Sequence, residues 1–251
     1  MSLVEHLLEL RRRLFRATLG LAVGAVIGWF LADIVLAALR APVLEIARTQ
    51  GRQASINYPD ITSAFDVKFE IALITGLVIS SPIWLYQIFA FLTPAFSGRE
   101  KRYVFGFFFS AVPLFLGGCA AGWLVVPHIV QLLTGFAGQG DSTIIEAKSY
   151  LDFVLKLVLV TGIAFVLPVF LVLLNLMGVL AGQTILKGWR IAIFAITIFT
   201  ALATPSADVL SMLLLAAPMA VLYFAAAGVA LLHDRRVARR EQALLESAGV
   251  A

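Results

Sequence analysis

The sequence predicts an all-α integral membrane protein with six transmembrane helices, both termini in the cytoplasm, and kinked helices that form a concave bundle. Three observations support this fold class. Hydrophobic residues make up 61% of the 251 residues and the mean hydropathy is +0.97, which leaves too little polar surface to cover a soluble globule. Six apolar runs reach or approach the length of about 20 residues that a helix needs to cross a bilayer. Arginine and lysine cluster at the amino end and after every second apolar run.

The apolar runs define the expected spans, and no long soluble segment separates them. These runs are residues 17–39, 69–92, 103–127, 150–176, 189–203 and 209–232. The fifth run is the shortest, so its helix either crosses a thin patch of membrane or ends below the far surface. We expect residues 1–236 to form a single six-span membrane domain and residues 237–251 to form a flexible cytoplasmic tail.

The basic residues predict the orientation of the chain. Of the 19 lysines and arginines, 13 lie at the termini and in the even-numbered loops. The remaining six lie on the other side: Arg40, Arg48, Arg52, Lys68, Lys148 and Lys156. Because cytoplasmic loops carry an excess of Lys and Arg, both termini are expected in the cytoplasm. The same bias explains part of the net charge of +4, so no nucleic-acid partner is expected.

The segment before the first span is predicted to be an amphipathic helix at the cytoplasmic interface. Its apolar face carries leucines at spacings of four, three and four residues: Leu3, Leu7, Leu10 and Leu14. Glu9 lies on another face, with Arg12 and Arg13 close enough for ion pairs within the helix. Spacing alone leaves two interpretations open, because Glu9 is either a surface partner of Arg13 or a binding group.

Prolines are expected to bend four of the spans, since each removes a backbone donor: Pro82, Pro113, Pro168 and Pro218. The bends either shape the helices and nothing more, or they build a concave wall that is open to lipid or to a partner helix.

The loop after the second span contains one carboxylate, Glu100, among three cations. Pro94 and Gly98 are expected to end the helix and to build a tight turn. Glu100 is interpreted either as a salt-bridge partner or as a binding group. Two further acids have simple structural interpretations: Asp208 as the cap of the sixth helix, and Asp152 as the ion-pair partner of a lysine four residues later.

The sequence offers no catalytic, metal or cofactor motif. The single cysteine, Cys119, lies inside an apolar run, and the three histidines have no ligand spacing. An intramembrane enzyme would need reactive groups that converge inside the spans, but histidines and aspartates stand mostly at their ends. We therefore expect no enzyme, no cofactor and no metal site.

Three local patterns carry a resemblance to a known family. They are residues 6–13 (HLLELRRR), residues 86–102 (YQIFAFLTPAFSGREKR) and residues 203–211 (ATPSADVLS). Together with the six expected spans they resemble the TatC family, the multispanning core of the twin-arginine protein translocase. The resemblance extends from residue 2 to about residue 236.

The resemblance implies which residues form the functional site. Signal-peptide binding falls on Glu9, Glu100, Phe91, Pro94 and Arg11. Structural or partner-contact roles fall on Pro42, Asp208 and Met212. A carboxylate can meet the planar fork of a guanidinium through two hydrogen bonds, whereas lysine is a point charge, so two acids at this interface would favour Arg-Arg over Lys-Lys.

The implied function is that of a twin-arginine signal-peptide receptor and of a scaffold of a translocase. Such a translocase exports folded proteins across the cytoplasmic membrane and is powered by the proton motive force. The expected partners are twin-arginine signal peptides of folded cargo, single-span proteins similar to TatA and TatB, anionic lipids and further copies of the chain. The expected location is the bacterial or archaeal cytoplasmic (inner) membrane.

The chain also departs from the family pattern at two places. Many relatives carry a glutamate two residues before the proline that corresponds to Pro168, and here that position is Val166. The segment with Asp66, Lys68 and Glu70 is shorter and more acidic than its usual counterpart. The alternative function is a small secondary permease with a substrate site among the helices, which would require buried ionisable groups that the apolar span centres lack.

Overall fold

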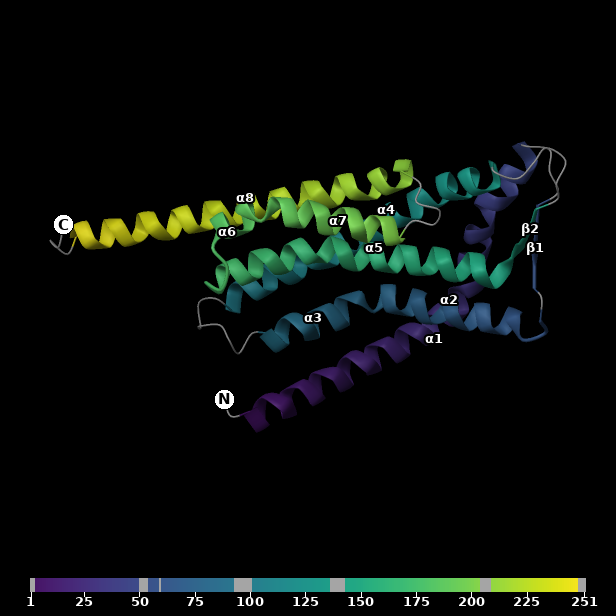
Figure 1. Cartoon of the computed structure of the whole chain (residues 1–251). Helices are drawn as coiled ribbons and strands as arrows, with labels where there is room; N and C mark the ends of the chain where they lie inside the picture. The colour runs from purple at the N-terminus through teal and green to yellow at the C-terminus, as the bar shows by residue number, and fades with distance from the viewer. Residues whose placement is uncertain are drawn as a thin grey trace.

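The computed structural model describes residues 3–49, 54–58, 60–92, 101–135, 143–203 and 209–247. Within these ranges the chain forms helices and one two-stranded sheet, in the order α1 (Leu3–Thr49), β1 (Ala54–Asn57), α2 (Ser63–Ile79), α3 (Ser81–Leu92), α4 (Lys101–Gly135), β2 (Thr143–Glu146), α5 (Ala147–Leu176), α6 (Gly182–Lys187), α7 (Trp189–Ala203) and α8 (Val209–Ser247). The helical fold class is confirmed. Both termini lie at one end of the bundle, here called the termini end, and the sheet lies at the opposite end, the sheet end (Figure 1).

Several helices are long and apolar enough to cross a membrane, which makes this a membrane protein. Among the described residues four helices meet the length and composition of a span, namely parts of α1, α4 and α8 and the whole of α5. Helices α2 and α3 meet them only together, because the pair is bent by 55° at a short break. Helix α7 has 15 residues and is shorter than a span, as its sequence predicts. The number of six crossings remains a prediction.

The bend between α2 and α3 occurs beside one of the four prolines. Pro82 is the second residue of α3, where its missing N–H leaves no helical hydrogen bond unmade. The indole Nε1 of Trp84 donates to the carbonyl oxygen of Leu77 at 2.9 Å, which satisfies an acceptor at the end of α2. By contrast, α4, α5 and α8 continue as helices through Pro113, Pro168 and Pro218.

The core is apolar and forms where α1, α2, α4, α5 and α8 meet. Helices α1 and α2 approach so closely that a Cβ added at Gly24 or Gly28 would overlap backbone oxygens of α2. A second apolar cluster joins α3, α4 and α5 around Phe89, Phe115 and Leu173. Val166 belongs to this cluster and is 3% exposed, so its position in α5 is a packed apolar site.

Two features of the fold go beyond the sequence prediction. The segments after α1 and before α5 pair as parallel strands, with Ala54 opposite Thr143 and Asn57 opposite Glu146. Helix α6 is a short helix whose first N–H, that of Gly182, donates to the Asp234 carboxylate of α8 at 2.6 Å. Two helices are longer than the expected spans. Helix α1 continues through Pro42 to its end, and α8 continues through residues 237–247, the segment expected to be a flexible tail. The flexibility itself remains a prediction.

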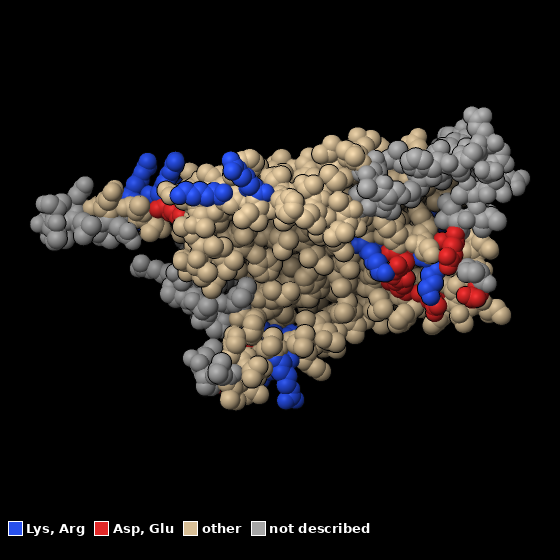
Figure 2. All heavy atoms as spheres, in the orientation of Figure 1, with Lys and Arg blue, Asp and Glu red and all other residues tan. Residues whose placement is uncertain are grey.

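Charged side chains gather at the two ends of the bundle. On the face that Figure 2 shows, the termini end carries mainly Lys and Arg, whereas the sheet end carries Asp and Glu intermixed with Lys. Ion pairs at the sheet end join Lys68 to Asp33, Lys148 to Asp66, and Lys156 to Asp152, at 2.9, 3.1 and 2.6 Å. The last of these confirms the predicted pair within α5.

Candidate functional site

The first turns of α1 place a carboxylate and a guanidinium side by side. Glu9 and Arg13 are four residues apart, so helical geometry puts them on one face. Arg13 donates from Nε and from Nη2 to the same oxygen of Glu9, Oε1, at 3.0 and 2.6 Å. The side chain of Glu9 is 22% exposed and that of Arg13 is 20% exposed. Partial burial reduces the screening of this pair by water, so it interacts more strongly than an ion pair on an open surface.

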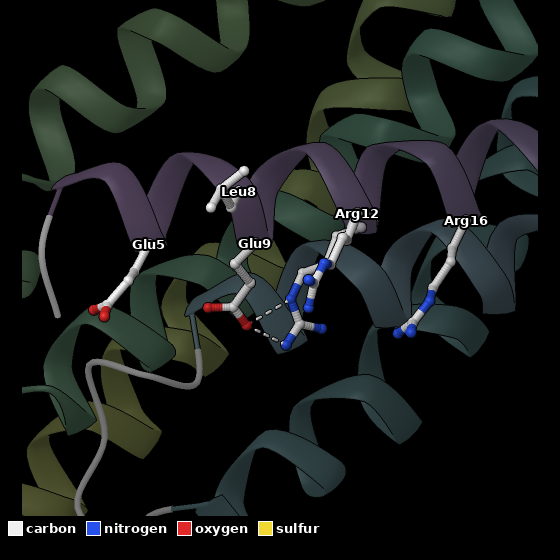
Figure 3. A pocket seen from close by; sticks show the side chains of 6 residues that line it. Glu5, Leu8, Glu9, Arg12 and Arg16 are labelled. Atoms are coloured by element: carbon white, nitrogen blue, oxygen red, sulfur yellow. Dashed lines mark hydrogen bonds and ion pairs between the residues drawn. The ribbon is translucent and has the colours of Figure 1, made fainter.

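A hollow of about 440 Å³ lies along the same face of α1. It is lined by Glu5, Leu8, Glu9, Arg12, Arg13 and Arg16. Figure 3 shows the carboxylates of Glu5 and Glu9 and the guanidinium groups of Arg12 and Arg16 projecting to one side of the helix. The hollow therefore offers acceptors for a cation at one end and donors for anions at the other.

The second oxygen of Glu9 is not used in this arrangement. Oε2 is buried and has no hydrogen-bond partner among the described residues. A buried carboxylate oxygen without a donor is costly, because it has lost water and gained nothing in return. Glu9 can therefore accept further hydrogen bonds from a donor that enters the hollow.

An aromatic contact joins the start of α1 to the end of α3. The rings of His6 and Phe91 are stacked, with their centroids 4.4 Å apart and their planes inclined by 29°. His6 precedes Glu9 by three residues, so the stack fixes the turn of α1 that carries the carboxylate. Phe91 lies next to the last residue of α3, directly before residues 93–100. The first two sequence patterns of the family resemblance thus meet in space.

The other residues assigned to the site have different outcomes. Arg11 is exposed on α1 and is not one of the residues that line the hollow. Glu100 and Pro94 lie outside the described residues, so their predicted place in the site stays a prediction. His6 was missed as a site residue, as were Glu5, Leu8 and Arg16 in the lining. Arg12 and Arg13 were expected only as ion-pair partners of Glu9. The sequence did indicate His6, because it precedes Glu9 by three residues within residues 6–13 and therefore lies on the same side of the helix.

The structural or partner-contact candidates lie elsewhere. Pro42 is half-buried in α1, roughly 50 Å along the helix from Glu9 at 1.5 Å per residue. Met212 is half-buried in the first turn of α8. Asp208 lies outside the described residues. Among the residues that the structure describes, no group of three or more His, Cys, Asp or Glu side chains could hold a metal ion.

Comparisons with known proteins agree on one family. A family model described as Sec-independent protein translocase protein (TatC) matches residues 5–218. A TatC protein of Xylanimonas cellulosilytica is 46% identical over 240 residues, which cover 96% of this chain and 87% of that protein. One from Rothia mucilaginosa is 38% identical and covers 96% of this chain and 82% of its own length. A crystal structure of the twin arginine translocase receptor TatC superposes with a TM-score of 0.75 at 29% identity, over 90% of this chain and 98% of that one.

Proposed function

The chain belongs to the TatC family of Sec-independent protein translocase proteins, and from that membership we propose that it binds the paired arginines of twin-arginine signal peptides. Membership makes the chain a component of a protein translocase, which is a membrane transport protein and not an enzyme. In the proposed role it is the signal-peptide receptor and a scaffold of the translocase. The energy for the export of folded proteins would come from the proton motive force.

The proposed site consists of Glu9, Glu100, Phe91, Pro94 and Arg11. The observation that carries the proposal is that the Glu9 carboxylate already holds a guanidinium through two hydrogen bonds in a half-buried hollow. The stack of His6 on Phe91 adds support, because it joins the helix that bears Glu9 to the helix that leads toward Glu100. A signal peptide lying along this face would bring its own guanidinium groups to the same acceptor.

Selectivity for arginine follows from the shape of the donor. A guanidinium presents parallel N–H groups that match the two oxygens of a carboxylate, whereas an ammonium offers donors around a single point. At a half-buried site this difference lowers the affinity for lysine, since water cannot easily hydrogen-bond to the carboxylate oxygen that lysine leaves unpaired.

Binding of a fluorescent Arg-Arg signal peptide to the full chain in lipid nanodiscs tests the proposal. Glu9→Gln keeps the size of the side chain and removes its charge. We expect Kd to rise about tenfold or more, because hydrogen bonds to charged groups contribute about 1.5–3 kcal/mol. Asp33→Asn is the matched control, since it removes an exposed carboxylate from the same helix at the sheet end, and its Kd should change less than about twofold. Equal losses in both variants would exclude Glu9 as the specific acceptor.

The proposed topology has six crossings of a bacterial or archaeal cytoplasmic membrane, with both termini in the cytoplasm. Three features support it: the termini share one end of the bundle, basic side chains predominate there, and α7 adds a short apolar helix to the longer ones (Figures 1 and 2). Residues 1–236 would form the membrane domain and residues 237–251 the cytoplasmic tail.

The proposed partners besides the signal peptide are single-span proteins similar to TatA and TatB, anionic lipids and further copies of the chain. Support for lipid binding comes from exposed arginines near the end of α8: Arg235, Arg236, Arg239 and Arg240. Exposed apolar side chains of α7 support contact with lipid tails or partner helices, and they include Ile191, Phe194 and Leu202. Pro42, Asp208 and Met212 stay candidates for structural or partner contacts.

The alternative of a small secondary permease receives no support from the described residues. Their buried polar side chains are all uncharged, and they are Ser63, Ser80, Ser81, Thr161, Asn175, Thr200 and Ser211. A midplane substrate site would be expected to include ionisable groups.

A further inference from the structure

The carboxylate that is proposed to receive a peptide arginine is already occupied by an arginine of the same chain. Arg13 uses two donors, Nε and Nη2, and directs both to Oε1 of Glu9. These are the kind of donors that an arginine side chain of a peptide would bring. The resident guanidinium therefore stands in the place of the ligand.

The position of Arg13 also blocks the best binding mode of the ligand. A fork-to-fork contact needs both oxygens of the carboxylate, one for each donor. Oε1 is taken by Arg13, and Oε2 is buried without a partner in the part of the chain that the structure describes. A peptide guanidinium gains both acceptors only when Arg13 leaves, so binding is an exchange of one guanidinium for another.

We propose that Arg13 regulates the signal-peptide site as a resident competitor, whose guanidinium must leave Glu9 before a cationic side chain of a peptide can bind there. The inference rests on the proposed function, since it assigns to Arg13 a role in the same site. It names the regulation of that site: the internal pair lowers the affinity for every peptide that must displace Arg13, and lowers it by the same factor, because each binds only to the fraction of sites from which Arg13 is released.

The preference for arginine over lysine comes from Glu9 itself. A peptide guanidinium that replaces Arg13 can reach both oxygens of the carboxylate, whereas a lysine ammonium restores the charge but not the paired geometry. The cost of breaking the Glu9–Arg13 pair is common to both ligands, so Arg13 sets the affinity and leaves the preference unchanged.

Peptide affinities of four variants test the inference. The full chain is placed in nanodiscs of neutral phosphatidylcholine, so that anionic lipid does not compete, and Kd is measured for an Arg-Arg peptide and for its Lys-Lys counterpart. Arg13→Gln is expected to tighten Arg-Arg binding about fivefold, which corresponds to ~1 kcal/mol. It should tighten Lys-Lys binding by about the same factor, so the ratio of the two Kd values stays as in wild type. Arg13→Lys, which leaves a weaker competitor, should lie between wild type and Arg13→Gln.

Arg190→Gln is the matched control, because it removes one exposed positive charge at the start of α7, outside the hollow. It should change both Kd values alike and by less than about twofold, through long-range charge alone. The inference is overturned if Arg13→Gln weakens Arg-Arg binding, or if it behaves like Arg190→Gln for both peptides.

Glu9→Gln separates this inference from the proposed function. If Glu9→Gln binds the Arg-Arg peptide as well as wild type does, the proposed site itself is wrong and the inference is overturned with it. If Glu9→Gln loses binding while Arg13→Gln leaves both Kd values unchanged, the site stands and only the role of Arg13 is excluded.

Discussion

At the scale of single residues, partial burial and a nearby aromatic contact distinguish Glu9 from an ordinary surface carboxylate. An exposed pair with Arg13 would be weak and easily screened by salt. Here both side chains are about one-fifth exposed, and the His6–Phe91 stack holds the preceding turn of the helix. The charge of Glu9 is thus kept at a fixed place where a guanidinium can reach it.

Removing the aromatic contact should weaken signal-peptide binding. His6→Ala deletes one ring of the stack and leaves the start of α1 less firmly held against α3. Because aromatic pairs contribute about 0.5–1.5 kcal/mol, Kd for an Arg-Arg peptide should rise about two- to tenfold, and His6→Phe should restore it. Fluorescence anisotropy measures both values. His128→Ala removes an exposed histidine of α4 and should leave Kd unchanged; an equal loss in both alanine variants would contradict the role of the stack.

Some contacts of the site could be predicted from the sequence and others could not. The Glu9–Arg13 and Asp152–Lys156 pairs were predictable, because both members sit on one helix and spacing fixes their distance. The contact of His6 with Phe91 was not, since it depends on how α1 and α3 are placed in space. Nothing in the spacing indicates that the ends of two distant segments meet.

At the scale of elements, close backbone contact fixes the position of α1. Gly24 and Gly28 of α1 face Gly76 and Ala72 of α2, where no side chain separates the two helices. Small residues at helix interfaces in membranes permit this approach and the dispersion contacts that come with it. The contact holds α1 in a defined direction, so the site at its first turns is positioned by packing farther along the same helix.

Filling this interface should destabilise the protein. In Gly24→Ala the new methyl group would overlap the carbonyl oxygen of Gly76, and the backbone must shift to relieve it. We expect a loss of about 1–3 kcal/mol in the free energy of unfolding, the usual cost of overpacking. Gly117→Ala is the control, since a Cβ there meets nothing within 4 Å. Denaturant titration in detergent micelles compares the two, and equal stability would refute close packing at Gly24.

Element boundaries were less predictable than the apolar runs. The bend near Pro82 was anticipated because proline removes a donor, but the helices around the three other prolines continue unbroken. The sheet was not predicted, because strands of four residues give too short a pattern to recognise and pair with a partner far along the chain. Helix α6 was missed for the same reason of length, and its start is fixed by a tertiary contact with Asp234.

At the scale of the whole molecule, the two ends of the bundle differ in their charge. Basic side chains predominate at the termini end, whereas acids and lysines pair at the sheet end (Figure 2). This asymmetry was readable from the sequence because charges between apolar runs must lie near one surface or the other. It places the candidate site, on the first turns of α1, at the more basic end.

Labelling of single cysteines tests the proposed orientation. In a Cys119→Ser background, Ser149→Cys places a thiol at the sheet end and Ala238→Cys places one in α8 at the termini end. A membrane-impermeant maleimide added to intact cells should label Ser149→Cys, and it should label Ala238→Cys only after the membrane is opened. The reverse pattern, or labelling of both in intact cells, would contradict a cytoplasmic location of the termini.

Photocrosslinking from the end of α3 tests directly whether Glu9 recognises paired guanidinium groups. A photoreactive amino acid replaces Phe91 in the full chain, and membranes are illuminated with an Arg-Arg signal peptide, with its Lys-Lys counterpart, or with no peptide. We expect an adduct with the Arg-Arg peptide alone, and its loss in a Glu9→Gln background. An adduct of equal yield with the Lys-Lys peptide, or one that survives Glu9→Gln undiminished, would contradict recognition of paired guanidinium groups by Glu9.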